Sequence, residues 1–299
     1  GYACVRAALS PEELVQAESL LWRHLEGVEE ATQRMNQRRP RGWRRGCPTS
    51  WVDGHGDALM TSTTHCESMW FVRSRPGVVA AFAAAHGTRE LIANYDRMSI
   101  NLPTSSGNSE ALRVAATSSA YGKFGVAQQM HTHSGDWYND SRPEFYAIVP
   151  LFGMNRITGA TAIVPGSHRK VEAINAHRSQ SRRNAQKTGR HLSEEVYRRD
   201  LEPFVENGLM PGITNVAAGD CVLFDTRTFH GGCSAEDPSG ALGHGSNSLL
   251  RAIYILGMSR SELQTPEILE ARRIAYELDL FWPPPVHHVP FSAQFIYIA

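Results

Sequence analysis

Residues 128–138 read Gln-Gln-Met-His-Thr-His-Ser-Gly-Asp-Trp-Tyr, and they set the interpretation of the whole chain. Side chains two apart in an extended segment point to the same face, so His131, His133 and Gly135 would share one face. A non-haem iron site needs two histidines and one carboxylate on one side of the metal, with the other side open for small ligands. A His-x-Asp strand would supply two of those three ligands. Here the spacing is present, but a glycine stands where the carboxylate should be.

The composition is that of an ordinary globular enzyme. The 299 residues are 41% hydrophobic and 20% charged, and we expect a single domain over residues 1–299. Thirty basic residues balance thirty acidic ones, so net charge indicates neither nucleic-acid nor membrane binding. Five cysteines without a C-x-x-C pair favour a reducing cytoplasm. With no run of about 18 apolar residues and no signal-peptide pattern, we expect neither a membrane span nor export. The oligomeric state is left undefined.

Two helix starts carry capping signals. Ser10-Pro11-Glu12-Glu13 combines a serine N-cap, a proline in the first turn and a glutamate that can close a capping box. Apolar residues at helical spacing then predict a buried stripe made of Leu14, Val15, Ala17, Leu21 and Leu25. Thr265-Pro266-Glu267 is the second start and predicts a helix to about Leu280. A third helix is predicted over residues 77–96, with a break near Gly87.

Most of the rest has the texture of short strands separated by turn residues. The predicted strands cover residues 98–102, 124–133, 145–152, 161–164, 221–224 and 250–256. This spacing is typical of an all-β barrel or jelly roll. The fold class is therefore mainly β, with flanking α-helices at both ends.

Three further motifs come after the opening segment in order. Residues 159–168, Gly-Ala-Thr-Ala-Ile-Val-Pro-Gly-Ser-His, read as a strand running into a tight turn. Gly219-Asp220 feeds another strand, and His230 comes ten residues after Asp220. Arg251 lies inside an apolar strand.

This ordered set resembles the phytanoyl-CoA dioxygenase-like family of Fe(II)/2-oxoglutarate enzymes over about residues 95–260. The resemblance implies a double-stranded β-helix core, of the jelly-roll or cupin-like type, in which His133 and His230 bind iron. It also implies that Arg251 receives the distal carboxylate of 2-oxoglutarate. A bidentate pair with a dicarboxylate would satisfy a buried arginine, as would a partner on a neighbouring strand. Gln128 is placed, more loosely, beside the cosubstrate.

Two other histidines compete for the metal. His168 belongs to the turn motif and is interpreted as structural. His244 also precedes Arg251, but the ten-residue interval from Asp220 favours His230.

The glycine at position 135 leaves three arrangements open. In the first, His133 is the proximal ligand and Gly135 leaves a coordination position for a halide, as in the His-x-Gly halogenases that the sequence resembles. In the second, His131 is proximal and His133 takes the place of the carboxylate. In the third, Asp136 is the carboxylate, which requires a bulge or an early turn at Gly135 because a regular strand points residue 136 to the opposite face.

The substrate is expected to be a free, small anion. Basic loops at residues 34–45 and 178–191 contain Arg41, Arg44 and Arg182, whose guanidinium groups match phosphate or carboxylate, although a solvated surface loop is the plainer interpretation. Trp137 could stack on a planar ring. The combination is similar to halogenases that chlorinate the sugar of deoxyadenosine monophosphate on the way to nucleoside antibiotics.

The sequence therefore predicts an oxidoreductase that uses Fe(II), 2-oxoglutarate, O2 and chloride to chlorinate an unactivated carbon. The alternative is a hydroxylase of the same family with Asp136 as ligand. A metal-free binding protein on the same scaffold is a third hypothesis.

Overall fold

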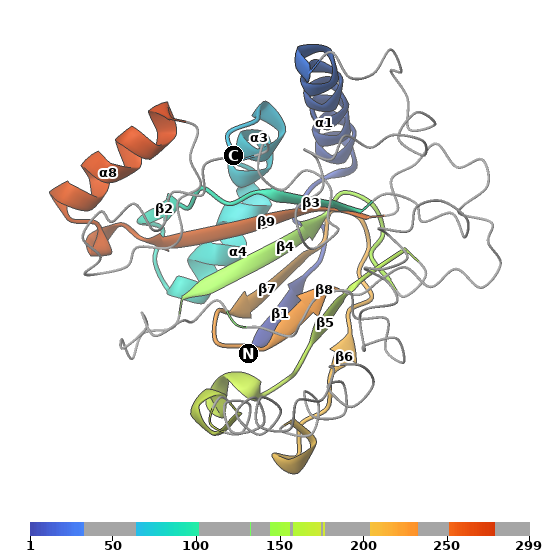
Figure 1. The fold of residues 1–299 in the computed structure, drawn as a ribbon, viewed down its shortest axis with the longest axis vertical. Coiled ribbons are helices and arrows are strands. Elements are labelled where there is room, and N and C mark those ends of the chain that lie inside the picture. Colours follow the sequence, from blue (N-terminus) through green and yellow to red (C-terminus); the bar gives the residue numbers. More distant parts are fainter. Residues whose placement is uncertain are drawn as a thin grey trace, which may run out of the picture.

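The computed structural model describes residues 1–32, 64–101, 132, 144–155, 158–174, 176, 204–232 and 251–278. Within them, two antiparallel sheets form the frame (Figure 1). The large sheet has the order β1 (Tyr2–Val5), β7 (Cys221–Asp225), β4 (Phe145–Pro150), β9 (Arg251–Arg260) and β2 (Leu91–Ala93), with β3 (Met98–Asn101) also paired to β9. The small sheet has the order β6 (Gly212–Ile213), β5 (Thr161–Ile163) and β8 (His230–Gly232).

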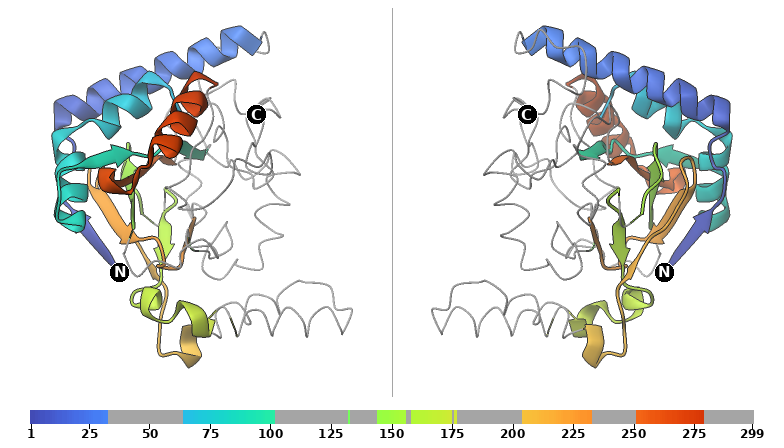
Figure 2. Two further views of the ribbon diagram at one scale, coloured as in Figure 1. Left: turned by 90° about the vertical axis from the view of Figure 1, so that its left-hand side faces the viewer. Right: turned by 90° about the vertical axis from the view of Figure 1, so that its right-hand side faces the viewer.

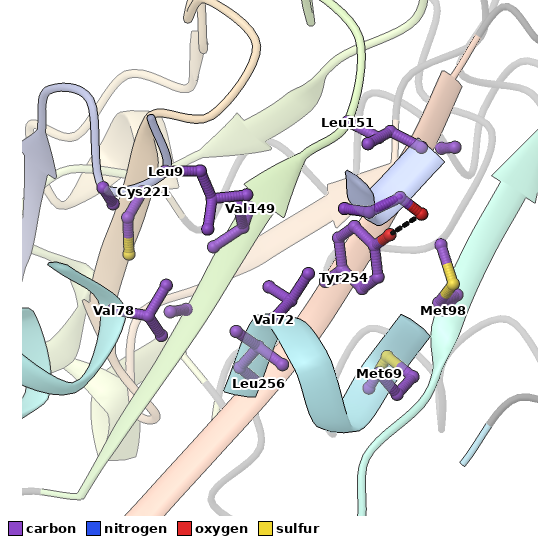
Figure 3. Close-up of a cluster of buried hydrophobic side chains, with 14 of the residues drawn as sticks. Leu9, Met69, Val72, Val78, Met98, Val149, Leu151, Cys221, Tyr254 and Leu256 are labelled. Carbon is purple, nitrogen blue, oxygen red and sulfur yellow. Dashed lines mark hydrogen bonds between the residues drawn. The ribbon is translucent and has the colours of Figure 1, made fainter. Parts of the chain in front are cut away.

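Helices cover one face of the large sheet. They are α1 (Pro11–Thr32), α3 (Glu67–Arg73) and α4 (Pro76–His86), and α8 (Pro266–Glu277) comes after the end of β9 and the short 3-10 turn η3 (Ser261–Leu263). Leu21, Val72 and Phe82 from these helices pack against Val149 and Leu256 of the sheet in one core cluster. Figure 3 shows Val72 and Leu256 side by side in this cluster, with Tyr254 and Met69 nearby. Burial of this apolar face is what holds the helices on the sheet.

The other face of the large sheet packs against the small sheet. Strand alternation divides β4 cleanly, because Ala147 and Val149 face the helices while Tyr146 and Ile148 join the second core cluster. That second cluster also contains Ile163 of β5. Figure 2 shows the helices and the small sheet on opposite sides of the large sheet. The molecule is thus built of layers, and the described side chains between the two sheets form a mainly apolar core cluster.

Both predicted helix starts are confirmed. Ser10 Oγ accepts from the Glu13 backbone N (3.2 Å), and Glu13 Oε2 accepts from the Ser10 backbone N (2.9 Å), which closes the capping box. Thr265 Oγ1 accepts from the backbone N of Ile268 (3.3 Å). The predicted stripe was wrong at Val15, which is 69% exposed. The last predicted helix ends at Glu277, slightly earlier than expected.

The prediction of one broken helix over residues 77–96 was wrong in its second half. The helix ends at Gly87, whose φ of 68° lies in the left-handed region that favours glycine. The chain then forms β2, paired with β9 through Leu91↔Arg260 and Ala93↔Met258. Local sequence does not reveal this strand, because its partner lies more than 160 residues further along the chain.

Other expectations are resolved only in part. The strands predicted at 98–102, 145–152, 161–164, 221–224 and 250–256 appear as β3, β4, β5, β7 and β9. The strand predicted over residues 124–133 lies outside the described residues. Cys4, Cys66 and Cys221 are free thiols. Among the described helices, none combines the length and the apolar character needed to span a bilayer.

Candidate metal centre

The interval between Asp220 and His230 is explained by the path of the chain. The five residues of β7 come directly after Asp220 in the large sheet, a connection of four residues crosses to the small sheet, and His230 is the first residue of β8. The spacing therefore places His230 in the small sheet, whereas β7 lies in the large sheet.

Asp220 itself has a structural role at the start of β7. Its Oδ1 accepts from the backbone N of Ala7 (3.0 Å), and its Oδ2 accepts from Arg6 Nη1 (2.7 Å) and from the backbone N of Ala217 (3.2 Å). Gly219, at φ 78°, makes the tight turn before it. The Gly-Asp motif thus anchors the start of β7 to the segment between β1 and α1.

His230 faces the interior between the two sheets. It is only 5% exposed, and its antiparallel partner on β5 is Ile163, a member of the second core cluster. Residues directly opposite each other in such a pair project to the same face. The ring centroids of His230 and Phe224 lie 4.5 Å apart.

One backbone contact determines how the imidazole of His230 can act. Its Nδ1 lies 2.9 Å from the carbonyl oxygen of Thr228. Because a carbonyl only accepts, Nδ1 must carry the proton, and in the neutral ring Nε2 then holds the lone pair. Metal-ligating histidines commonly have this arrangement, in which the second ring nitrogen donates to a carbonyl. The tautomer and the burial both suit a metal ligand.

The connection from β7 to β8 is held by a short-range ion pair. The Arg227 backbone N and Nε both donate to Asp225 Oδ1 (2.9 Å each), and Nη2 donates to Oδ2 (2.6 Å). This carboxylate raises the pKa of the Arg227 guanidinium. The backbone N of Thr228 donates to the Asp225 carbonyl (2.8 Å). Contacts to Asp225 inside the turn therefore hold the Thr228 carbonyl in the position where it faces Nδ1 of His230.

A second contact reaches the same turn from β5. Ser167, which is fully buried, lies on the 3-10 turn η2 (Ser167–Arg169). Its Oγ accepts from the backbone N of Phe229 (2.9 Å) and donates to the carbonyl of Val164 (2.8 Å). Gly166, at φ 81°, makes the reversal that brings the serine back.

The remaining sequence predictions have different outcomes. Arg251 begins β9, where its backbone pairs with Asn101. His168 lies on η2, where burial lowers the pKa of its imidazole. Within the part of the chain that the structure describes, no three His, Cys, Asp or Glu side chains gather as a metal site. The other candidates lie outside the described residues, namely Gln128, His131, His133, Gly135, Asp136, Trp137, Arg41, Arg44, Arg182 and His244.

Sequence reasoning did not find the residues that support His230. Ser167 was visible only as part of a turn motif, and nothing in the sequence indicates that its hydroxyl contacts Phe229. Thr228 acts through its backbone carbonyl, which leaves no side-chain signal at all.

Comparison with known protein families identifies the family of this chain. The sequence profile of the phytanoyl-CoA dioxygenase family matches residues 1–234. The chain therefore belongs to this family of Fe(II)/2-oxoglutarate-dependent oxidoreductases, as the sequence motifs predicted. Iron and 2-oxoglutarate are the cofactors that the family uses.

Solved structures give a weaker likeness. AviO1 from Streptomyces viridochromogenes Tue57 is 13% identical over 89% of this chain and 92% of its own, with a TM-score of 0.48. SnoN, a non-haem alpha-ketoglutarate-dependent epimerase from nogalamycin biosynthesis, is 14% identical over 87% of this chain and 77% of its own (TM-score 0.45). A search of curated protein sequences finds no match.

Proposed function

We propose that this chain is an Fe(II)/2-oxoglutarate-dependent halogenase that chlorinates an unactivated carbon of a free, small anionic molecule. The observation that carries the proposal is Gly135, two residues after His133, at the position where a carboxylate ligand would stand in a hydroxylase. Glycine has no side chain that can ligate iron. The position beside the two histidines would therefore be open to a halide.

The residues present fit the cofactors of the family. We assign iron to His133 and His230, and the setting of His230 supports this because its Nδ1 donates to the Thr228 carbonyl. We assign the distal carboxylate of 2-oxoglutarate to Arg251, with Gln128 beside it.

The layered arrangement also supports the finer fold assignment. Two antiparallel sheets face each other, and the chain crosses from one to the other between β7 and β8. We propose that they form a double-stranded β-helix, or jelly roll, with the metal centre in its interior. In a water-poor interior the hydrogen bond from His230 to Thr228 is strengthened, which keeps the ring oriented.

When bound, the cofactors supply the oxidising power that removes a hydrogen atom from an unactivated carbon. The tasks of the chain are binding and placement. We assign Arg41, Arg44 and Arg182 to the anionic group of the substrate and Trp137 to a planar ring, so that one carbon is held towards the metal. Placement of this kind selects which hydrogen is removed.

A hydroxylase of the same family is the second candidate, and the carboxylate at Asp136 favours it. It requires a bulge at Gly135, a residue type that bulges use. A site of three histidines, His131, His133 and His230, is the remaining arrangement. In either of these, a protein side chain and not a halide would complete the metal site.

Chloride dependence separates these candidates without knowledge of the substrate. Under anaerobic conditions, the full chain with Fe(II) is titrated with 2-oxoglutarate in chloride buffer and in chloride-free buffer, and the charge-transfer absorption is followed. A halogenase should bind 2-oxoglutarate with an affinity that depends on chloride, because the two ligands share one metal. An affinity unaffected by chloride would support the hydroxylase, and no absorption at all would support a metal-free binding protein.

Gly135→Asp tests the open position directly. We expect the introduced carboxylate to occupy it, so that 2-oxoglutarate still binds but its affinity no longer depends on chloride. With deoxyadenosine monophosphate as the probe substrate, any chlorinated product seen by mass spectrometry should also disappear.

Ser134→Asp is the matched control. It adds the same carboxylate one residue earlier, on the opposite face of an extended segment, and should leave the chloride dependence intact. Equal effects of the two substitutions would place Gly135 away from the metal and would contradict the halogenase assignment.

A further inference from the structure

We infer that Ser167 is a positioning residue for His230, and that its buried hydroxyl sets the affinity of the site for a divalent metal ion. This inference rests on the proposed role of His230 as an iron ligand. It concerns a residue of the turn after β5 that would not itself touch the metal.

The hydroxyl replaces a missing bond between two strands. Val164 and Phe229 lie opposite each other, one position beyond the pair Ile163↔His230. In an antiparallel ladder such a pair can exchange two backbone hydrogen bonds. One of them is present, from the Val164 N to the Phe229 carbonyl (2.9 Å). The other is relayed, because the Phe229 N donates to Ser167 Oγ and Ser167 Oγ donates to the Val164 carbonyl.

The relay is needed where β5 leaves the sheet. Pro165 has no N–H to donate, and Gly166 reverses the chain with a φ of 81°. Ser167 is 0% exposed, so no solvent water can substitute for its hydroxyl. The serine thus extends the pairing of the two strands by one residue beyond their regular ends.

The residue added to the strand pairing is Phe229, and it lies between the two groups that set the geometry of the proposed metal ligand. Phe229 stands between Thr228, whose carbonyl receives Nδ1, and His230, which carries the ring. With both its N–H and its carbonyl bound to the β5 side, the Phe229 backbone has little freedom to rotate. Loss of the relay frees this peptide, so the Thr228 carbonyl and the imidazole are no longer held in one geometry.

Metal affinity of the Ser167→Ala variant tests the inference. The full chain and the variant are titrated anaerobically with Co(II), which is close to Fe(II) in ligand preference, and the d–d absorption is followed. We expect the dissociation constant of Ser167→Ala to rise by about 10-fold, the lower end of the range for loss of a hydrogen-bond partner of a metal-bound histidine, because Ser167 acts on that partner through the Thr228–Phe229 peptide. Thermal unfolding of the metal-free proteins is measured in parallel.

Ser68→Ala is the matched control. Ser68 is also 0% exposed, and its Oγ bridges the Ala17 carbonyl (3.0 Å) and the Tyr254 hydroxyl (2.7 Å) in the other core cluster. It should lower the unfolding temperature to a similar extent but leave Co(II) affinity unchanged. If Ser167→Ala and Ser68→Ala weaken Co(II) binding equally, Ser167 contributes only to the stability of the fold, and the inference is wrong.

A third variant separates this inference from the role of His230. If His230→Ala binds Co(II) as tightly as the wild type, the metal assignment itself fails. If His230→Ala loses binding while Ser167→Ala retains it, the metal assignment stands and the role of Ser167 is wrong. Should Ser167→Ala not fold, Ser167→Cys, which fills the site with a somewhat larger thiol of weaker hydrogen bonding, is titrated in its place with the same expectation.

Discussion

The imidazole rings of His230 and His86 illustrate how one backbone carbonyl can fix the chemistry of a histidine. His230 donates from Nδ1 to the Thr228 carbonyl (2.9 Å), whereas His86 places Nε2 2.8 Å from the Met258 carbonyl. The neutral rings should therefore be opposite tautomers. Of these two rings, His230 keeps the lone pair on Nε2 and His86 keeps it on Nδ1.

We predict this difference for the metal-free protein. In nitrogen-15 spectra of histidine-labelled protein at neutral to mildly basic pH, the His230 signals should report a protonated Nδ1, and those of His86 a protonated Nε2. Burial lowers the pKa of His86, which keeps that ring neutral in this range. His230→Ala and His86→Ala identify the signals. A protonated Nε2 in His230 would contradict the hydrogen bond to Thr228.

At this scale the sequence predicts the place of a candidate ligand better than the residues around it. The interval after Asp220 predicts that His230 follows a strand and a turn, because strand and turn lengths are local properties, and the structure places His230 at the start of β8. Ser167 could not be assigned a role, since its hydrogen bond spans 62 positions of the sequence. The assignment of His230 and His133 as iron ligands remains a prediction.

Among the elements, β9 connects the most parts of the fold, since it pairs with β4, β3 and β2. Between the pairs Ala93↔Met258 and Met98↔Tyr254, residues 94–97 lie opposite residues 255–257, so the segment between β2 and β3 carries one extra residue. The extra residue makes a β-bulge. The polar side chains of Asn94 and Asp96 in this bulge lie close to Gly257.

Gly257→Ala should destabilise the protein. A Cβ there would lie 2.8 Å from Asn94 Nδ2 and 2.9 Å from Asp96 Oδ2, closer than real contacts allow. We expect a loss of about 1–3 kcal/mol in the free energy of unfolding, measured with urea, as for other overpacked sites. Gly153→Ala, where a Cβ would meet nothing within 4 Å, is the control and should change stability by less than about 0.5 kcal/mol. Equal stabilities of the two variants would contradict the crowding at Gly257.

The elements also show where sequence patterns succeed. Ser10 and Thr265 were predictable as helix caps, because a cap depends only on residues within one turn. Strand β2 was not, because its existence depends on the free edge that β9 offers after the bulge. Gly87 correctly marked the end of a helix, but no local pattern revealed the strand beyond it.

For the whole molecule, the buried Asp96 carboxyl in the bulge between β2 and β3 is a source of pH sensitivity among the described residues. Asp96 is 3% exposed, and burial raises the pKa of its carboxyl to about 7 although the nearby charge of Arg73 opposes this. Arg73 is also 3% exposed and donates to the carbonyls of Thr64 (2.7 Å) and Asp96. The arginine thus ties helix α3 to the bulge.

The sign of the effect is set by proton binding. A carboxyl whose pKa is higher in the folded than in the unfolded state binds more protons when folded, so its contribution is greatest at low pH and is lost as pH rises. We predict that wild type, relative to Asp96→Asn, loses up to about 4 kcal/mol of unfolding free energy between pH 4 and 7, because each pKa unit corresponds to about 1.4 kcal/mol. Urea unfolding at several pH values measures this difference. A difference that does not vary with pH would show that Asp96 titrates normally.

The antiparallel pairing of Tyr2 with Phe224 and of Val5 with Cys221 has a consequence for biosynthesis. A strand made early must wait at the ribosome until more than two hundred further residues have emerged before it finds its neighbour. Closing so long a loop is slow, and the histidine that lies beyond β7 is translated later still. If His230 binds iron as proposed, the metal can be loaded only after β8 has been translated, and a nascent chain that stalls before β7 would expose the unpaired edge of β1 to chaperones.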